Sequence, residues 1–352
     1  MKQLELHESL AEGRLEEVWQ CLEAGADPNA RDEEGCTALC VAITAGEEGA
    51  ALALLDHTKT CPHLGRMEAD GSEVHPLCFA AHEGLPGVVA RLIADSGTDP
   101  NCCTADGRTP LSLAGSEDHA AVVRLLLAAQ GCDPNLPDGD GVSPAWVAAE
   151  LGASEALREL LADDRVDVNK ANSAKQTPLW IAAGVGNQEA LCALLSHPMI
   201  DPNLADLEGL TPLHIAASRG HSGIVRDLLQ CGDKLDPNST TQKGQTALGL
   251  AAARGHVGAV RELLQCPAVE LNRPTEGGGT VLCVAALAGK VEVVSALLAS
   301  QRIDPRAPDL QGKSPLQVVT EVLEGQTSEL AEMKLKPKLT EVQELLLEAE
   351  AT

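Results

Sequence analysis

Imidazole and thiol side chains gather in one segment near the start of the chain. They are His57, Cys61, His63, His75 and Cys78. Such side chains can ligate zinc, but their spacing matches no structural zinc pattern, and the segment is rich in glycine and charge. A surface loop between two folded segments accounts for a stretch of this length without a metal. We therefore expect a loop insertion at 57–73 and no metal site.

No other group of residues has the spacing that catalysis requires. The chain contains no Gly-x-Ser-x-Gly elbow, and no phosphate-binding loop precedes Gly289-Lys290. Gly184-Val185-Gly186 begins like a dinucleotide-binding fingerprint but lacks its third glycine. We expect a protein that is not an enzyme and needs no cofactor.

The elements that would have to position any reactive group form a repeat. Residues 211–221 read Thr-Pro-Leu-His-Ile-Ala-Ala-Ser-Arg-Gly-His, and the leading Thr or Ser recurs every 34 or 35 residues. It stands at Thr109, Ser143, Thr177, Thr211, Thr246, Thr280 and Ser314. A period of this size indicates stacked units, each too small to bury its apolar face until a neighbour packs on it.

Each repeat carries the start and stop signals of helices. A hydroxyl such as that of Thr211 can cap a helix, and Pro212 then occupies the first turn, where its missing N–H costs nothing. Gly220 ends this helix, since glycine tolerates positive φ. Apolar residues at helical spacing follow at 224–229. The pattern predicts two short helices in each unit.

The pattern Asp-Gly-x-Thr-Pro-Leu-x-x-Ala-Ala-x-x-Gly-His, then Val-x-x-Leu-Leu and Asp-Pro-Asn, resembles the ankyrin repeat over almost the whole chain. The resemblance implies an all-α ankyrin-repeat solenoid of about ten helix-turn-helix units with short turn or hairpin connections. It also implies that His214 hydrogen-bonds to the backbone of a neighbouring repeat, a structural role in place of a catalytic one.

The resemblance divides the chain into segments. We expect an N-terminal capping ankyrin repeat at 1–35, a degenerate repeat at 36–56, the loop insertion at 57–73, seven ankyrin repeats at 74–312, and a C-terminal capping repeat at 313–352 with an internal insertion at 324–339. The last helix is expected at 340–350. Two departures affect local geometry: Lys175 replaces a turn glycine, and Gly115, with no glycine ahead of His119, predicts a frayed or shifted helix.

Composition narrows the range of partners. Aromatic residues make up 1% of the chain, and the formal net charge is −26 with a pI near 4.6. Phosphate backbones and anionic membrane surfaces should be repelled, so we expect no nucleic acid and no membrane insertion. Residues 1–175 hold 31 acids and 12 bases. This acidic part favours a protein partner with a basic surface, although it also serves solubility.

The cysteines and the N-terminus bear on the compartment. The sequence has twelve cysteines and no C-x-x-C pair, and the first residues begin a charged amphipathic helix with no apolar signal region. Reduced thiols fit a cytoplasmic protein, with the nucleus as the alternative compartment. We expect the chain to be a monomer.

Proteins with this resemblance bind partners through a concave face made by the turn tips and the exposed ends of the inner helices. The positions that map to it are Glu150, Leu151, Val185, Leu207, Glu208, Leu210, Arg219, Lys243 and Arg254. Exposed leucines bordered by charge suit a protein contact, while Trp146 and Trp180 are expected to pack between repeats. We predict a non-enzymatic scaffold or adaptor. The alternative is a regulatory or targeting subunit that inhibits or recruits a catalytic partner.

The family resemblance also points to one modification. Ankyrin repeats are substrates of a cytosolic asparaginyl hydroxylase that prefers a leucine eight residues before an asparagine preceded by acidic and aliphatic residues. Asn169, with Leu161 upstream, and Asn272, with Leu264 upstream, fit this preference. The alternative is that each asparagine only ties down the backbone of its turn.

Overall fold

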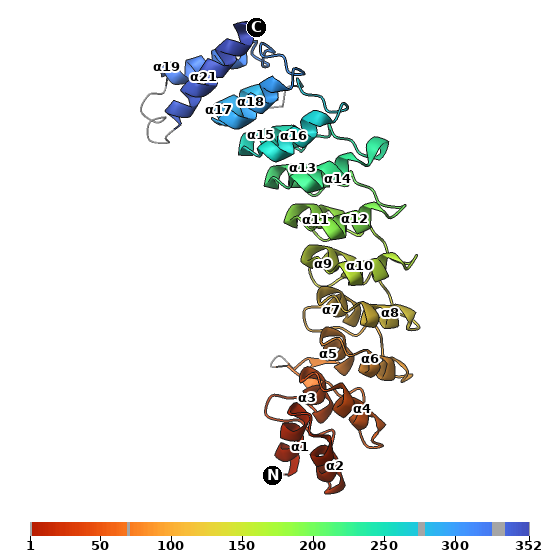
Figure 1. Cartoon of the computed structure of the whole chain (residues 1–352). Coiled ribbons are helices and arrows are strands. Elements are labelled where there is room, and N and C mark those ends of the chain that lie inside the picture. The colour runs from red at the N-terminus through yellow and green to blue at the C-terminus, as the bar shows by residue number, and fades with distance from the viewer. Residues whose placement is uncertain (1, 69–70, 274–278, 326–334, 352) are drawn as a thin grey trace. The chain divides into compact units, whose positions relative to one another are not determined.

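The computed structural model describes residues 2–68, 71–273, 279–325 and 335–351. The chain divides into two compact units, unit 1 (Met1–Ser173) and unit 2 (Ala174–Thr352). Each is built from pairs of short helices, of which the first is called inner and the second outer (Figure 1).

In unit 1, inner helices stack on inner helices and outer on outer. The inner helices are α1 (Lys2–Ala11), α3 (Ala38–Thr44), α5 (Pro76–His82), α7 (Pro110–Ser116) and α9 (Pro144–Leu151). The outer helices are α2 (Leu15–Glu23), α4 (Glu48–Asp56), α6 (Pro86–Ile93), α8 (Ala120–Ala128) and α10 (Ser154–Leu161). Each helix contacts the next of its own kind.

Unit 2 follows the same plan. Its inner helices are α11 (Pro178–Val185), α13 (Pro212–Arg219), α15 (Ala247–Arg254), α17 (Val281–Leu287) and α19 (Pro315–Gly325). Its outer helices are α12 (Gln188–Leu195), α14 (Ser222–Leu229), α16 (Val257–Gln265), α18 (Val291–Ala299) and α21 (Lys336–Ala351), and a short 3-10 helix lies at Gly232–Lys234. Inner and outer helices again contact the next of their kind. The predicted all-α ankyrin-type fold is confirmed; the number of about ten units stays a prediction.

The inner helices begin as the sequence predicts. The hydroxyl oxygens of Thr109 and Thr177 accept hydrogen bonds from the backbone N–H three residues later, each at 3.1 Å. Thr211 goes further, because His214 at the third helical position also bonds back to the Thr211 backbone. The N-cap side chains of outer helices α2 to α18 make no such hydrogen bond in the described structure, and at two of these helices the previous repeat supplies one. The Glu48 carboxylate accepts from Gly87 N–H at 2.6 Å, and that of Asp118 from Ala156 N–H at 2.8 Å.

The departures from the repeat pattern keep the backbone geometry. Lys175 adopts φ of 60°, close to the 80° and 79° of the turn glycines Gly141 and Gly209, so the turn survives the replacement. Asp118 takes φ of 60° where other repeats have glycine. Of the expected fraying or shift, only a shift of the helix end is seen: α7 is continuous from Pro110 to Ser116, Gly115 is buried, and the helix ends one residue earlier than α9. The left-handed residue stands nine residues after the N-cap in both repeats, at Asp118 and at Gly152, but Glu117 already leaves the helical geometry one residue before Asp118.

The core of each unit is aliphatic and small. Paired alanines such as Ala182–Ala183 and Ala251–Ala252 have no exposed surface, which lets neighbouring inner helices approach closely. Leucines such as Leu194 and Leu228 fill the space between inner and outer helices. Because buried aliphatic area supplies the main stabilising term, each helix pair depends on its neighbours.

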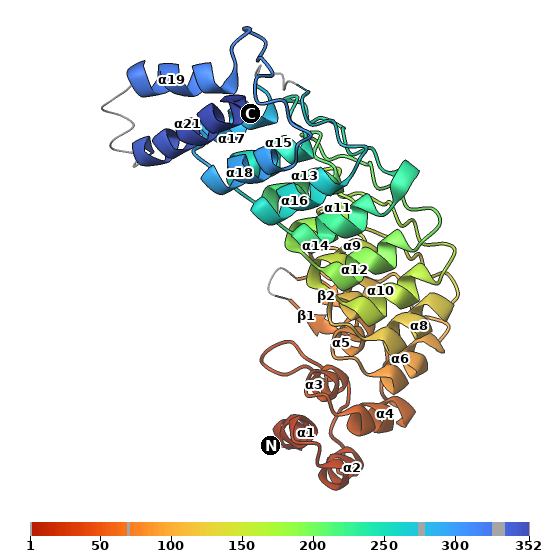
Figure 2. The same cartoon turned by 45° about the horizontal axis from the view of Figure 1, so that its top comes forward.

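The insertion after α4 contains a strand pair that the expected loop lacks. β1 (Arg66–Met67) pairs antiparallel with β2 (Glu73–Val74), beside α5 in Figure 2. Arg31 secures it: its guanidinium donates to Gly65 O at 2.7 Å and to the Glu73 carboxylate at 2.6 Å. The hairpin is therefore tied to the first repeats.

The C-terminal helix pair differs from expectation in its boundary. α21 begins at Lys336, four residues before the expected start, because Pro337 is tolerated in a first helical turn. Residues 326–334 of the predicted insertion lie outside the described part. Across the described ranges, no helix is long and apolar enough to cross a membrane.

Candidate protein-binding surface

Three of the predicted binding residues lie at equivalent ends of neighbouring inner helices in unit 2. Val185, Arg219 and Arg254 are the last residues of α11, α13 and α15. All three side chains are exposed. Since these helices pack side by side in this order, their ends form one edge of the unit.

Three further predicted residues lie at turn tips that hydrogen bonds join. Leu207, Glu208 and Lys243 are exposed. Leu207 N–H donates to Ala174 O at 3.2 Å, and Gln242 N–H donates to Glu208 O at 3.0 Å. The Gln242 amide also donates to Leu207 O at 2.6 Å. Successive tips are thus held in register.

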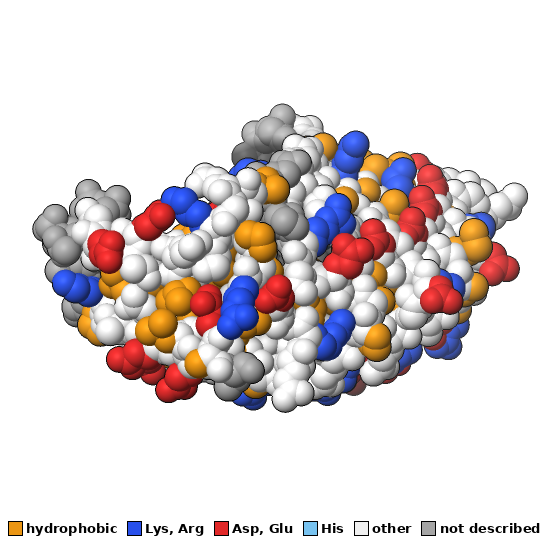
Figure 3. Space-filling view, turned by 90° about the horizontal axis from the view of Figure 1, so that it is seen from above, with side chains coloured by type: hydrophobic (Ala, Val, Ile, Leu, Met, Phe, Trp, Pro, Cys, Tyr) orange, Lys and Arg blue, Asp and Glu red, His pale blue; other side chains and the backbone are white. Residues whose placement is uncertain are grey.

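The basic side chains of this region are not engaged in ion pairs in the described structure. Within the described residues, Arg219, Lys243 and Arg254 form no ion pair. On the outer helices, by contrast, Arg226 pairs with Glu262 at 2.6 Å and lowers the pKa of that carboxyl by hydrogen bonding. We call Val185, Leu207, Glu208, Arg219, Lys243 and Arg254 the candidate surface. The visible face in Figure 3 likewise intersperses hydrophobic side chains with charged ones.

Leu210 corrects one expectation, because its side chain is half-buried instead of exposed. Its N–H donates to the Asp206 carboxylate at 2.8 Å, and its carbonyl accepts from Trp180 Nε1 at 2.9 Å. Trp180 itself is buried, as is Trp146. Leu210 therefore serves to lock the turn onto the inner helices, and neither indole is free to anchor a partner.

Glu150 and Leu151 lie in unit 1, at the end of α9. Leu151 is exposed and Glu150 is half-buried. They occupy the same edge position of their repeat as Gly184 and Val185 do in unit 2. They are therefore equivalent in register to the candidate surface but not part of it.

Two further exposed apolar residues of unit 2 lie at a turn tip and at the end of an inner helix. Leu310 precedes Ser314 by four residues, as Leu207 precedes Thr211, and is 69% exposed. Leu287 ends α17 and is also exposed. The sequence alone identifies Leu310 if the residue four positions before the N-cap Thr or Ser is compared in every repeat.

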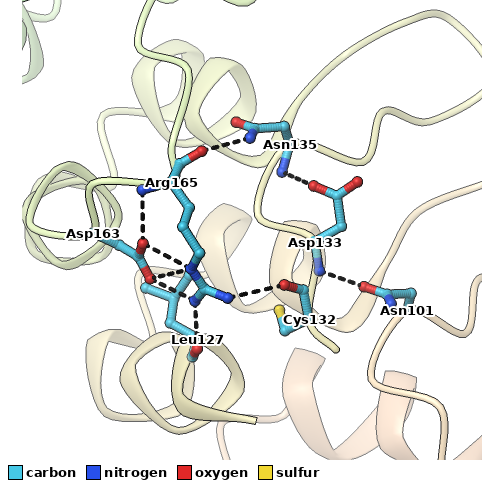
Figure 4. Close-up of polar contacts among 7 residues, drawn as sticks. All are labelled: Asn101, Leu127, Cys132, Asp133, Asn135, Asp163 and Arg165. Atoms are coloured by element: carbon cyan, nitrogen blue, oxygen red, sulfur yellow. Dashed lines mark hydrogen bonds and ion pairs between the residues drawn. The ribbon is translucent and has the colours of Figure 1, made fainter. Parts of the chain in front are cut away.

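The asparagines of the Asp-Pro-Asn segments bridge consecutive loops. Asn135 Nδ2 donates to Arg165 O at 2.7 Å, and its Oδ1 accepts from Asp167 N–H at 2.7 Å. Asn101 makes the same type of contact with Asp133 N–H, as Figure 4 shows. In the same view, the Arg165 guanidinium donates to Leu127 O and Cys132 O, and its hydrogen bonds hold the pKa of Asp163 below its usual value.

The two predicted hydroxylation sites belong to this series. Asn272 makes a bridge with longer bonds than those of Asn135, donating to Arg302 O at 3.4 Å and accepting from Asp304 N–H at 3.2 Å. Asn169 N–H donates to the Asp167 carboxylate at 3.0 Å. The bridging role is thus present at Asn272, and hydroxylation of either residue stays a prediction.

His214 has the structural role that the resemblance implies. Its Nδ1 lies 2.7 Å from Thr211 Oγ1, and its Nε2 donates to Gln245 O at 3.1 Å. Burial lowers the pKa of His214, so the imidazole is neutral at pH 7. His221 and His256 also bridge repeats, donating to Gly184 O and Ser218 O.

The histidine and cysteine side chains near the insertion, considered as zinc ligands from the sequence, form no such cluster in the described structure. Over the described residues, no group of three or more His, Cys, Asp or Glu side chains is placed to hold a metal ion. His63 lies 3.5 Å from the Asp95 carboxylate, and its ring is 5.8 Å from that of His75.

Comparison with known proteins agrees with the fold. A family model described as ankyrin repeats in three copies matches residues 77–172, 146–239 and 233–309. The chain belongs to the ankyrin repeat family, whose fold is generally a non-catalytic module for protein–protein interaction.

Two solved structures are similar to it. The crystal structure of the ankyrin repeat domain of Bcl-3, described as a unique member of the IkappaB protein family, is 29% identical with a TM-score of 0.57, covering 63% of this chain and 97% of that chain. The crystal structure of EF0377, an ankyrin repeat protein, is 26% identical with a TM-score of 0.51, covering 55% of this chain and 98% of that chain.

Proposed function

We propose that the chain is a non-enzymatic scaffold or adaptor that binds a partner protein through the candidate surface of unit 2. The observation that carries this proposal is a contrast between side chains that pack or hydrogen-bond within the fold and side chains that are left exposed. Leu210, Trp180 and His214 are occupied in packing and hydrogen bonds. By contrast, the side chains of Leu207, Val185 and Arg219 are exposed, and Arg219 forms no ion pair with the described residues.

The chemistry of the surface selects a kind of partner. Leu207 and Val185 offer apolar area, and three bases stand against the single acid Glu208. A contact segment with apolar side chains flanked by carboxylates would complement it. The prediction of a basic surface on the partner rests on a different part of the chain, the acidic residues of 1–175, which would attract such a surface. We propose a monomer acting in the cytoplasm or nucleus.

Capture with matched variants tests the proposal. Full-length protein would be immobilised, and proteins retained from lysate would be quantified by mass spectrometry for wild type, Leu207→Glu and Arg254→Glu. The controls are Met199→Glu, which changes a more exposed apolar residue of unit 2 (72% against 54%), and Arg261→Glu on outer helix α16. We expect the same partner to be lost with the first pair and kept with the controls.

The outcomes separate the alternatives. Equal capture by all variants would place binding elsewhere and refute the candidate surface. If the partner lost with Leu207→Glu is an enzyme present in stoichiometric amount, the chain is the regulatory or targeting subunit of the alternative prediction. Circular dichroism of each variant excludes loss of helix as the cause.

A further inference from the structure

Two thiols of unit 1 lie side by side although 24 residues separate them. Cys78 is in the first turn of α5, and Cys102 is in the turn that precedes α7. Their sulfur atoms are 3.8 Å apart, and Cys78 Sγ is also 3.8 Å from Cys102 O. The two sulfurs of a disulfide are about 2.05 Å apart, so side-chain rotations that bring these sulfurs closer by less than about 2 Å would join them.

The two thiols differ in access. Cys78 is 1% exposed, whereas Cys102 is half-buried and reachable from solvent. Cys78 also lines a hollow of about 280 Å³ together with Val74, Phe79 and Leu113. Because Cys102 is the more exposed of the two thiols, a small oxidant reaches it first, and Cys78 is placed to react second.

Ionisation follows the same order. The hydrogen bond from Cys78 lowers the pKa of Cys102, and the His75 imidazole lowers it further against burial and the Asp99 charge. The pKa of Cys78 is raised by its contact with Cys102 and by burial, with smaller contributions from Cys103 and Asp106. Burial raises the pKa of other cysteines of unit 1, such as Cys132. The thiolate, which is the nucleophile, is thus favoured at Cys102.

The position of His75 supports this arrangement. Its Nδ1 accepts from Leu77 N–H at 3.0 Å and so caps α5. Its Nε2 is buried and has no hydrogen-bond partner of ordinary geometry among the described residues. The cap holds the ring beside the thiol pair, and its other ring contact is with His63, whose centroid lies 5.8 Å away.

We propose that Cys78 and Cys102 form a redox modification site that a hydroperoxide converts into a disulfide. The Cys102 thiolate attacks one oxygen of hydrogen peroxide, the O–O bond breaks, and the leaving hydroxide takes up a proton to become water. The resulting Cys102 sulfenic acid is attacked by the Cys78 sulfur, the S–O bond breaks, and the hydroxyl leaves with the Cys78 proton as a second water. Two thiols are oxidised and one peroxide is reduced.

The full-length protein tests this site directly. Protein reduced and freed of reductant would be treated with one equivalent of hydrogen peroxide, alkylated and digested with trypsin. Cys78 lies in the peptide 67–91 and Cys102 in 92–108, which also holds Cys103, so the linked pair has an identifiable mass and the variants assign which cysteine of 92–108 is joined. We expect this pair to form in wild type and in the matched control Cys103→Ser, and to be absent from Cys78→Ser and Cys102→Ser.

A sulfenic acid probe tests the order of reaction. Dimedone should label Cys102 in Cys78→Ser and should not label Cys78 in Cys102→Ser. His75→Asn keeps a capping side chain but removes the imidazole. This variant should slow disulfide formation near pH 6, by up to about tenfold for each unit by which the imidazole lowers the pKa of Cys102. It should have no effect at pH 10, where the Cys102 thiol ionises without the imidazole.

Three results would overturn the proposal. One is oxidation spread over the cysteines with no excess of the 67–91 and 92–108 pair. Another is dimedone labelling of Cys78 ahead of Cys102. The third is stoichiometric zinc in the purified protein that blocks alkylation of both thiols, which would make the pair metal ligands instead.

Discussion

The asparagine bridges offer a graded test of how consecutive repeats are joined. Asn238 Nδ2 donates to Ala268 O at 2.8 Å and its Oδ1 accepts from Glu270 N–H at 2.8 Å. The equivalent bonds of Asn272 are 3.4 and 3.2 Å long. Both residues lie in unit 2, so Asn238→Ala and Asn272→Ala remove the same groups from one background, differing in bond length and in exposure.

The expected size follows from the bonds. A typical hydrogen bond contributes about 0.5–1.5 kcal/mol net, and these groups are partly exposed, so water replaces part of each loss. We expect Asn238→Ala to lower the local opening free energy by about 1–2 kcal/mol, which accelerates exchange of the Glu270 amide by about 5–30-fold. Asn272→Ala should change the Asp304 amide by less than about 1 kcal/mol, because its bonds are near the limit of hydrogen-bond length.

Hydrogen exchange followed by mass spectrometry measures these amides directly. Asn238→Asp serves as an intermediate, since it keeps the acceptor for Glu270 N–H and removes the donor to Ala268 O. Equal effects of Asn238→Ala and Asn272→Ala, or no change at Glu270, would refute the reasoning that bridge length sets loop stability.

Three further predictions concern stability, each read from urea unfolding. Burial lowers the pKa of His214, so the unfolded chain binds more protons at this residue than the folded chain does. The contribution of His214 to the free energy of unfolding is therefore complete above pH about 6.5 and falls by up to about 1.4 kcal/mol per pH unit below it, down to the folded pKa. His214→Gln should remove this slope. Leu228→Ala in the core should cost about 2–5 kcal/mol, whereas Met199→Ala on the surface should stay within about 0.5 kcal/mol. Lys175→Gly should stabilise the folded chain by about 0.5–1 kcal/mol, because glycine adopts positive φ without strain. Asp118→Gly should not, because it also removes the carboxylate that accepts from Ala156 N–H. Equal gains in the two variants would contradict this difference.

Much of the fold is predictable because repeat signals are local. Thr211, Pro212 and Gly220 specify the start and end of one helix within ten residues, and the same signals recur at fixed spacing. The hairpin in the insertion was not predictable, because it depends on Arg31 meeting Glu73 across 42 residues. Lys175 takes a positive φ, which its residue type does not predict.

The candidate surface shows the same division. Exposure of Val185, Arg219 and Lys243 follows from their register in the repeat. The half-burial of Leu210 does not follow from register, and neither does the hydrogen bond that its carbonyl accepts from Trp180, thirty residues earlier. The approach of Cys78 to Cys102 is likewise a tertiary contact, and neither spacing nor residue type marks it.

The most direct test of the central claim is a hydrogen exchange footprint of the full chain with and without its captured partner. The account predicts slower exchange on binding in the turn tips at 205–210 and 241–244 and at the ends of α11, α13 and α15, with outer helices α12, α14 and α16 unchanged. Protection confined to those outer helices would contradict the claim that partners bind through the candidate surface.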